Sequence, residues 1–168
     1  CSNSFQLQNV SAYYSSLNIS GTRNVTATGM RVNQSSTPFA GTSPTIQALV
    51  LNSTEQVGSP AAPRYQLQIY FPGAMRTVSE LPFLDNNNIP GLENGAAGWL
   101  SLRGDGVFDG LRSNRDYSRT IVMGRLNITS VSPKIRGTIS SLRVIGDGYP
   151  TLSSSEGYVN NVVFCIEP

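Results

Sequence analysis

Histidine is absent from this chain of 168 residues, lysine occurs once, and charged residues of both signs make up only 13%. An average soluble protein has about 25% charged residues. The absence of histidine excludes a Ser-His-Asp triad, a Cys-His pair and histidine-ligated metals. The formal net charge of +2 gives no polybasic surface of the kind that binds nucleic acid. We therefore expect no nucleic-acid partner, and no motif predicts a cofactor.

Long hydrophobic runs are also missing. The longest uninterrupted apolar stretch is Ala48-Leu49-Val50-Leu51, whereas a membrane-spanning helix needs about 20 apolar residues. The hydrophobic fraction of 39% is nevertheless too high for a disordered chain of low charge. The length suits one folded domain, and no linker or internal repeat divides the chain. We expect a single domain over residues 1–168.

Cysteine occurs only at Cys1 and Cys165. One interpretation is an acylated Cys1, because Cys followed by Ser resembles the first residues of a processed bacterial lipoprotein. The other is a disulfide between the two cysteines, which would stabilise the fold by about 4–5 kcal/mol in the chain-entropy model. The two interpretations exclude each other. Both place the protein outside the cytoplasm, either periplasmic or at the cell surface.

Apolar and polar residues alternate with a period of two, which is typical of β-strands. Tyr65, Leu67, Ile69 and Phe71 share one face of a strand that Pro72-Gly73 ends. In the C-terminal segment, Tyr158, Val162, Phe164 and Ile166 are expected on one face. Further strands are predicted at Phe5 to Tyr13, Asn24 to Val32, Thr45 to Leu51, Gly98 to Leu102, Thr120 to Thr129 and Lys134 to Ile145. No window supports an amphipathic helix, and the best helical candidate is one turn near Val78 to Leu84.

The segment Lys134 to Ile145 changes phase in its middle. Ile135, Gly137 and Ile139 hold one phase, and Leu142 and Val144 hold the other. The change at Ser140-Ser141 predicts a β-bulge or a strand that passes between sheets. With eight or more strands separated by Gly-, Asn- and Asp-rich turns, the sequence predicts an all-β, two-layer antiparallel β-sandwich with Greek-key or jelly-roll wiring and little or no helix.

Two groups of side chains could carry a site or a modification. Oxygen ligands for Ca²⁺ could come from one loop, although surface ion pairs with neighbouring arginines explain the same residues. Glycosylation sequons could be used, although strands rich in Thr, Ser and Asn generate sequons without use. The calcium candidates are Asp105, Asp109, Asn114 and Asp116. The sequon residues are Asn9, Asn18, Asn24, Asn33, Asn52 and Asn127.

The aromatic residues and the terminal strands suggest interaction surfaces. Trp99 and the seven tyrosines could form a platform for sugars, and Arg103-Gly104-Asp105 is a tripeptide bound by some adhesion receptors. The first and last strands could pair with a neighbouring subunit through Phe5, Leu7, Val162 and Phe164, or could pair with each other within the chain.

Three stretches carry a family resemblance: Tyr65 to Pro72, Gly124 to Thr129 and Arg136 to Ser140. They resemble small secreted lipoprotein β-sandwich domains of Bacteroidota-like bacteria, in which a strand ending in Phe-Pro is followed by Gly-X-Leu/Ile-X-Ile-Thr and Gly-Thr-Phe/Ile-Ser strands. The resemblance covers about twenty residues. It implies a compartment outside the cytoplasm and no enzyme activity.

These observations favour a non-enzymatic, extracytoplasmic accessory subunit. On this expectation the chain is a membrane-anchored lipoprotein that docks onto other protein subunits of an envelope or membrane complex, with the membrane reached through lipid on Cys1. Low charge and many Ser, Thr, Asn and Gln residues suit broad neutral contacts. One alternative is a filament or pilus subunit that assembles by strand exchange. Another is a carbohydrate-binding or adhesion module.

Overall fold

Eleven β-strands and no helix make up the part of the chain that the structure, a computed structural model, describes: residues 1–12, 19–34, 46–58, 61–84, 95–102, 118–145 and 157–168. Eight strands form one closed antiparallel barrel, in which each strand pairs with the barrel strands before and after it in the chain. The barrel strands are β1 (Ser4–Ala12), β2 (Ile19–Gln34), β3 (Ile46–Ser53), β6 (Tyr65–Pro72), β8 (Ala97–Leu102), β9 (Ser118–Ser130), β10 (Ile135–Ile145) and β11 (Gly157–Ile166).

The all-β prediction is confirmed, but the prediction of an open two-layer sandwich with Greek-key wiring is wrong. Pairing of β9 with β10 and of β1 with β11 joins all eight strands into a ring. The wiring is an up-and-down meander, because each barrel strand lies beside its neighbours in sequence. Sandwiches and filled barrels produce the same in–out alternation, so the alternation alone cannot distinguish them.

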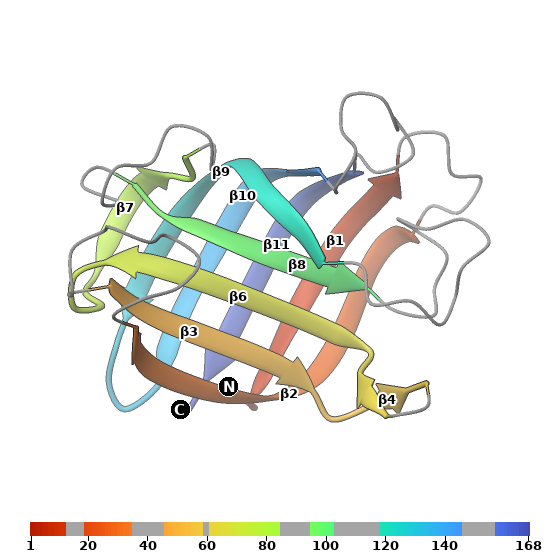
Figure 1. Cartoon of the computed structure of the whole chain (residues 1–168), viewed down its shortest axis with the longest axis horizontal. Helices are drawn as coiled ribbons and strands as arrows, with labels where there is room; N and C mark the ends of the chain where they lie inside the picture. Colours follow the sequence, from red (N-terminus) through yellow and green to blue (C-terminus); the bar gives the residue numbers. More distant parts are fainter. Residues whose placement is uncertain (13–18, 35–45, 59–60, 85–94, 103–117, 146–156) are drawn as a thin grey trace.

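Two strands turn the corners of this barrel. The first half of β2 pairs with β1 and the second half, from Ala27, pairs with β3. The start of β9, from Ser118 to Thr120, pairs with β8, while the strand from Thr120 to Ser130 pairs with β10. Figure 1 shows β3, β6 and β8 crossing steeply in front of β10, β11 and β1. The barrel is therefore flattened into two crossing walls that are continuous at both corners.

Side chains fill the barrel interior. Phe5, Phe71 and Phe164 are no more than 2% exposed, and they pack with buried Leu, Ile and Val residues from all eight strands. The predicted inward face of β6 is confirmed, since Tyr65, Leu67, Ile69 and Phe71 all belong to this core. Eight-stranded barrels have an interior that side chains can fill. The packed interior leaves the outer surface as the place to look for a binding site.

Four neighbouring strands change phase at the same level of the barrel. Buried positions step by three residues once in each of β1 (Leu7 to Val10), β10 (Ile139 to Leu142) and β11 (Val159 to Val162). In β9, Gly124 at φ 154° lies opposite the extra residue of β10. A register shift of one residue in one strand alone would turn its apolar residues outward. Because the neighbouring strands shift at the same level, their apolar residues all continue to face the barrel interior.

We call this level the bulge line, and it consists of Gly21, Asn9, Asn160, Ser141 and Gly124 from β2, β1, β11, β10 and β9. Asn9 and Ser141 have φ values of 51° and 53°, a left-handed conformation that is uncommon for residues other than glycine. The Asn9 side-chain Oδ1 accepts a hydrogen bond from the Gly21 N–H at 2.9 Å, which fixes the bend between β1 and β2. The predicted bulge at Ser140-Ser141 is thus confirmed.

Three short strands lie outside the barrel ring. β4 (Gln56–Val57) and β5 (Ala62–Pro63) form a hairpin. β7 (Val78–Pro82) pairs with β9 and extends the wall beyond the end of β8. The expected helical turn at Val78 to Leu84 is therefore wrong, because Val78, Leu81 and Pro82 pair with β9 in an extended ladder.

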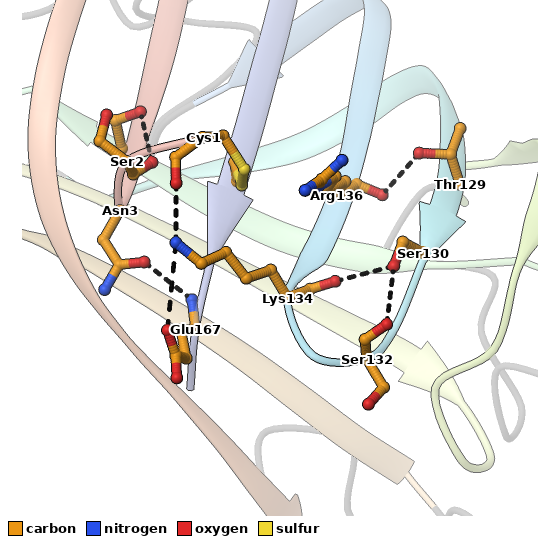
Figure 2. Close-up of a disulfide and its surroundings, with 11 residues drawn as sticks. Cys1, Ser2, Asn3, Thr129, Ser130, Ser132, Lys134, Arg136 and Glu167 are labelled. Carbon is orange, nitrogen blue, oxygen red and sulfur yellow. Dashed lines mark hydrogen bonds and ion pairs between the residues drawn. A yellow bond between two sulfur atoms is a disulfide. The ribbon is translucent and has the colours of Figure 1, made fainter.

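The two chain ends lie side by side at one end of the barrel (Figure 1). Lys134 Nζ donates a hydrogen bond to the Cys1 carbonyl at 2.7 Å and lies 4.0 Å from a Glu167 carboxylate oxygen. The Glu167 N–H donates to Asn3 Oδ1 at 3.0 Å. Figure 2 shows these contacts around the bond between Cys1 and Cys165. The ends are thus held by one covalent bond and several polar contacts.

Candidate functional site

An open groove of about 350 Å³ crosses the outer wall where the bulge line passes from β1 to β9. Its described lining comes from four adjacent strands. Val159 and Leu142 are each 1% exposed and form its floor. The lining residues are Asn9 and Ser11 of β1, Met123 of β9, Ser141, Leu142 and Arg143 of β10, and Tyr158, Val159 and Asn160 of β11. The volume is within the range of small-ligand sites, about 300–1,000 Å³.

One cross-strand row forms the first side of the groove. Ser11 lies opposite Tyr158, Tyr158 opposite Arg143, and Arg143 opposite Met123. Side chains directly opposite on one face have Cβ atoms about 4.5–5.5 Å apart. A phenol ring, a guanidinium, a thioether and a hydroxyl are therefore presented to the same small volume.

The bulge line forms the second side of the groove. Asn9, Asn160 and Ser141 follow one another across β1, β11 and β10, one step below the row of Tyr158 and Arg143. Residues held in the left-handed region cost about 1–3 kcal/mol and cluster at functional sites. Two of the three described non-glycine residues with positive φ line this groove.

Exposed apolar surface also gathers here. The large hydrophobic residues exposed in the described chain are Met30, Met123 and Tyr158, at 53%, 54% and 43%. Met123 and Tyr158 both line the groove. An aromatic ring with an exposed face, beside amide and hydroxyl groups, can contact the apolar face of a ligand while its polar rim is hydrogen-bonded.

The described lining presents hydroxyl, amide, phenol, thioether and guanidinium groups. The hydroxyl groups belong to Ser11, Ser141 and Tyr158, and the amides to Asn9 and Asn160. Arg143 is the permanently charged group of this lining, since guanidinium groups stay protonated in proteins. The site can therefore hold a ligand through stacking, hydrogen bonds and one positive charge.

Trp99, which the sequence suggested as part of a sugar platform, lies away from this groove on β8. Its ring packs edge-on against Tyr70 with 5.1 Å between ring centroids, and its Nε1 donates to Thr120 Oγ1 at 3.2 Å. Tyr70 is only 3% exposed, belongs to a small outer core with Ala48 and Ala97, and has its pKa raised to about 12 by burial. Tyr70 and Trp99 therefore serve packing on this face.

The structure joins Cys1 and Cys165 in a disulfide. Cys165 is 8% exposed, next to the last buried residue of β11, and Cys1 is exposed. This disulfide occupies the Cys1 thiol. A lipid attached through a thioether would need the same thiol.

The sequon residues are placed very differently from one another. Asn24 is exposed on β2. Asn9 Oδ1 accepts from Gly21, Asn127 Oδ1 accepts from the Glu80 N–H at 2.9 Å, and Asn52 Oδ1 accepts from Gln66 Nε2 at 2.8 Å. Asn33 lies in β2 opposite Gln47, and Asn18 lies outside the described residues. Asn24 is thus the described sequon residue whose environment is most open.

The predicted calcium ligands Asp105, Asp109, Asn114 and Asp116 lie outside the described residues, as does Arg103-Gly104-Asp105. Within the residues that are described, no group of three or more Cys, Asp or Glu side chains could hold a metal ion.

The four residues suggested for pairing with another subunit lie inside the barrel. Phe5 lies opposite Phe164, and Leu7 lies opposite Val162, within the β1–β11 ladder of one chain. All four are buried, at 0–2% exposed. The other edge of β1 pairs with β2, and that of β11 pairs with β10. Neither terminal strand therefore has an open edge in this fold.

Sequence reasoning missed the groove as a site. Tyr158 was expected on the same face of its strand as Val162, but the phase change at Asn160 turns it to the opposite, outer face. The one available signal was the phase change at Ser140-Ser141, which marks the bulge line without showing which neighbouring strands share it.

In the portion of the chain with described coordinates, no helix has the length and hydropathy to cross a membrane. Comparison of the chain with protein-family models, with curated proteins and with solved structures finds no match. Function must therefore be inferred from the groove itself.

Proposed function

We propose that the chain is a non-enzymatic, extracytoplasmic binding module that holds a short saccharide in the groove lined by Tyr158 and Arg143. One observation carries the proposal: an exposed aromatic ring converges with amide, hydroxyl and guanidinium groups on a groove of about 350 Å³. This is the carbohydrate-binding alternative raised by the sequence, moved from Trp99 to a different surface.

Sugar rings suit this combination of groups. A pyranose has an apolar face of C–H groups and a rim of hydroxyls, so it needs an aromatic surface and polar partners together. The exposed Tyr158 ring can cover the apolar face, because aromatic side chains combine a large apolar area with a polar handle. Asn9, Asn160 and Ser141 supply donors and acceptors for the rim.

The groove is also preorganised. All its described lining residues stand on paired strands, whose positions are fixed by hydrogen-bond ladders on both sides. Sites on strands hold their geometry better than sites on loops. Less ordering on binding means that a small contact area can still give measurable affinity.

The disulfide supports the extracytoplasmic part of the proposal, since disulfides persist in oxidising compartments. Because the bond occupies the Cys1 thiol, we do not include a lipid anchor on that thiol. Docking to a larger complex is left out as well, since the described surface feature with the most defined chemistry is the groove.

The test is a screen of neutral and acidic oligosaccharides immobilised on an array, followed by calorimetric titration of those retained. Tyr158→Ala should weaken binding by about tenfold or more, and Tyr158→Phe should keep most of it, because the ring supplies the stacking surface. Chain integrity is checked by thermal unfolding of each variant.

The two exposed methionines provide a matched control. Met123 at 54% exposed lines the groove, and Met30 at 53% exposed lies on β2 outside its described lining. Met123→Ala should weaken binding, whereas Met30→Ala should leave it unchanged. An array blank at 100 μM protein, or equal effects of the two substitutions, would contradict the proposal. Cleavage of a bound oligosaccharide would contradict its non-enzymatic part.

A further inference from the structure

The position of Arg143 points to a narrower ligand class. Arg143 stands in β10 directly between Tyr158 of β11 and Met123 of β9, and it is half-buried in the groove wall. A guanidinium at a partly desolvated position binds an anion more strongly than one in open solvent. Arg143 therefore supplies a positive charge in addition to the hydrogen bonds that a neutral sugar needs.

A second arginine stands near the groove. Arg143 lines it, and Arg125 of β9 is exposed next to Gly124 of the bulge line. Positive charge near a site creates a potential that favours ligands of the opposite sign, so these two arginines favour an anionic ligand.

We propose, as a step that rests on the proposed function, that the bound saccharide contains a uronic acid, with its ring on Tyr158 and its carboxylate on Arg143. In a uronic acid the carboxylate is attached directly to the pyranose ring. The cross-strand spacing of Tyr158 and Arg143, about 5 Å between Cβ atoms, matches one residue that offers a ring face and an adjacent carboxylate.

The guanidinium of Arg143 is suited to a carboxylate. The planar guanidinium fork can form two parallel hydrogen bonds to a planar carboxylate. Arg143 is the cation of the described lining. Asn9 and Asn160 remain for the ring hydroxyls.

The test compares each acidic oligosaccharide with its own neutral ester. Tetragalacturonate and tetramannuronate are titrated beside their methyl esters, which keep the ring and the hydroxyls but remove the charge. The acidic forms should bind at least tenfold more tightly at low salt, and most of this preference should disappear on raising NaCl to 0.5 M, because salt screens a partly exposed ion pair.

Variants assign the preference to Arg143. Arg143→Gln should abolish the difference between acid and ester while keeping binding of the ester, and Arg143→Lys should restore part of the difference. Arg136→Gln is the matched control, because Arg136 is exposed on the same strand and lies opposite Cys165 at the other end of the barrel. This control should keep the full preference.

The outcomes separate the two proposals. If the esters bind as tightly as the acids and Tyr158→Ala weakens both, the uronic acid inference is wrong and the saccharide function stands. Equal or tighter binding of sulfated tetrasaccharides would overturn the choice of a carboxylate. If neither acids nor esters bind and the array is also blank, the function itself is wrong.

Discussion

Removing the disulfide should lower stability strongly without changing the fold. The bond joins residues 164 positions apart, so it closes nearly the whole chain into a loop. In the chain-entropy model a loop of this length reduces the entropy of the unfolded state by an amount worth about 5 kcal/mol at 25 °C. Total stabilities of domains are about 5–15 kcal/mol, so the bond supplies a large share.

The cleanest perturbation is Cys1→Ala. Cys1 is exposed and Cys165 is buried, so this substitution opens the loop while the packed Cys165 side chain stays in place. The β1–β11 ladder keeps its eight residue pairs and the barrel remains closed. We expect the midpoint of thermal unfolding to fall by about 10–20 °C, because each kcal/mol shifts it by about 2–4 °C in a domain of this size.

Urea unfolding, followed by the fluorescence of Trp99, measures the effect directly. The wild-type protein with a phosphine reductant should match Cys1→Ala, and the dependence on urea should steepen in both, because the opened chain exposes more surface on unfolding. Ser2→Ala, at the neighbouring exposed residue, should stay within about 0.5 kcal/mol of wild type. A shift of less than about 3 °C with an unchanged slope would refute this reasoning.

Three further predictions concern single side chains. Burial raises the pKa of Tyr70 to about 12 from about 10 in the unfolded chain, so the unfolded state loses its proton first and stability should fall by about 2 kcal/mol between pH 10 and 12; urea midpoints across this range should fall less steeply in Tyr70→Phe. Ser141→Gly should raise the free energy of unfolding measured in urea by about 0.5–1 kcal/mol by relieving a φ of 53°, and a fall would contradict the assigned strain. Gly137→Ala should destabilise by about 1–3 kcal/mol in the same assay, because an added Cβ would lie 2.4 Å from the Asn127 carbonyl oxygen and 2.5 Å from Phe164 Cζ; an unchanged midpoint would show that the wall can adjust.

The strands themselves were largely predictable from the sequence. Each of the eight barrel strands overlaps a segment that the sequence predicts to be a strand, and the shared face of Tyr65 to Phe71 is as expected. Local alternation is a property of neighbouring residues, so it survives in the sequence. β7 was missed because it is five residues long and its pairing with β9 depends on contacts distant in sequence.

Barrel closure could not be derived in the same way. It depends on β9 pairing with both β8 and β10, and no local pattern shows that one strand serves two walls. The groove was hidden for a related reason. Tyr158, Arg143 and Met123 become neighbours only through the registers of three strands, and a single undetected slip at Asn160 places Tyr158 on the wrong face.

The most direct test of the saccharide site is to map binding onto the backbone by NMR. Titration of ¹⁵N-labelled protein with tetragalacturonate should shift amide resonances along β1, β9, β10 and β11 around Asn9, Met123, Arg143 and Tyr158. The amides of β3, β6 and β8, around Trp99, should stay unchanged. Shifts centred on the Trp99 face, with none in the groove, would contradict the account.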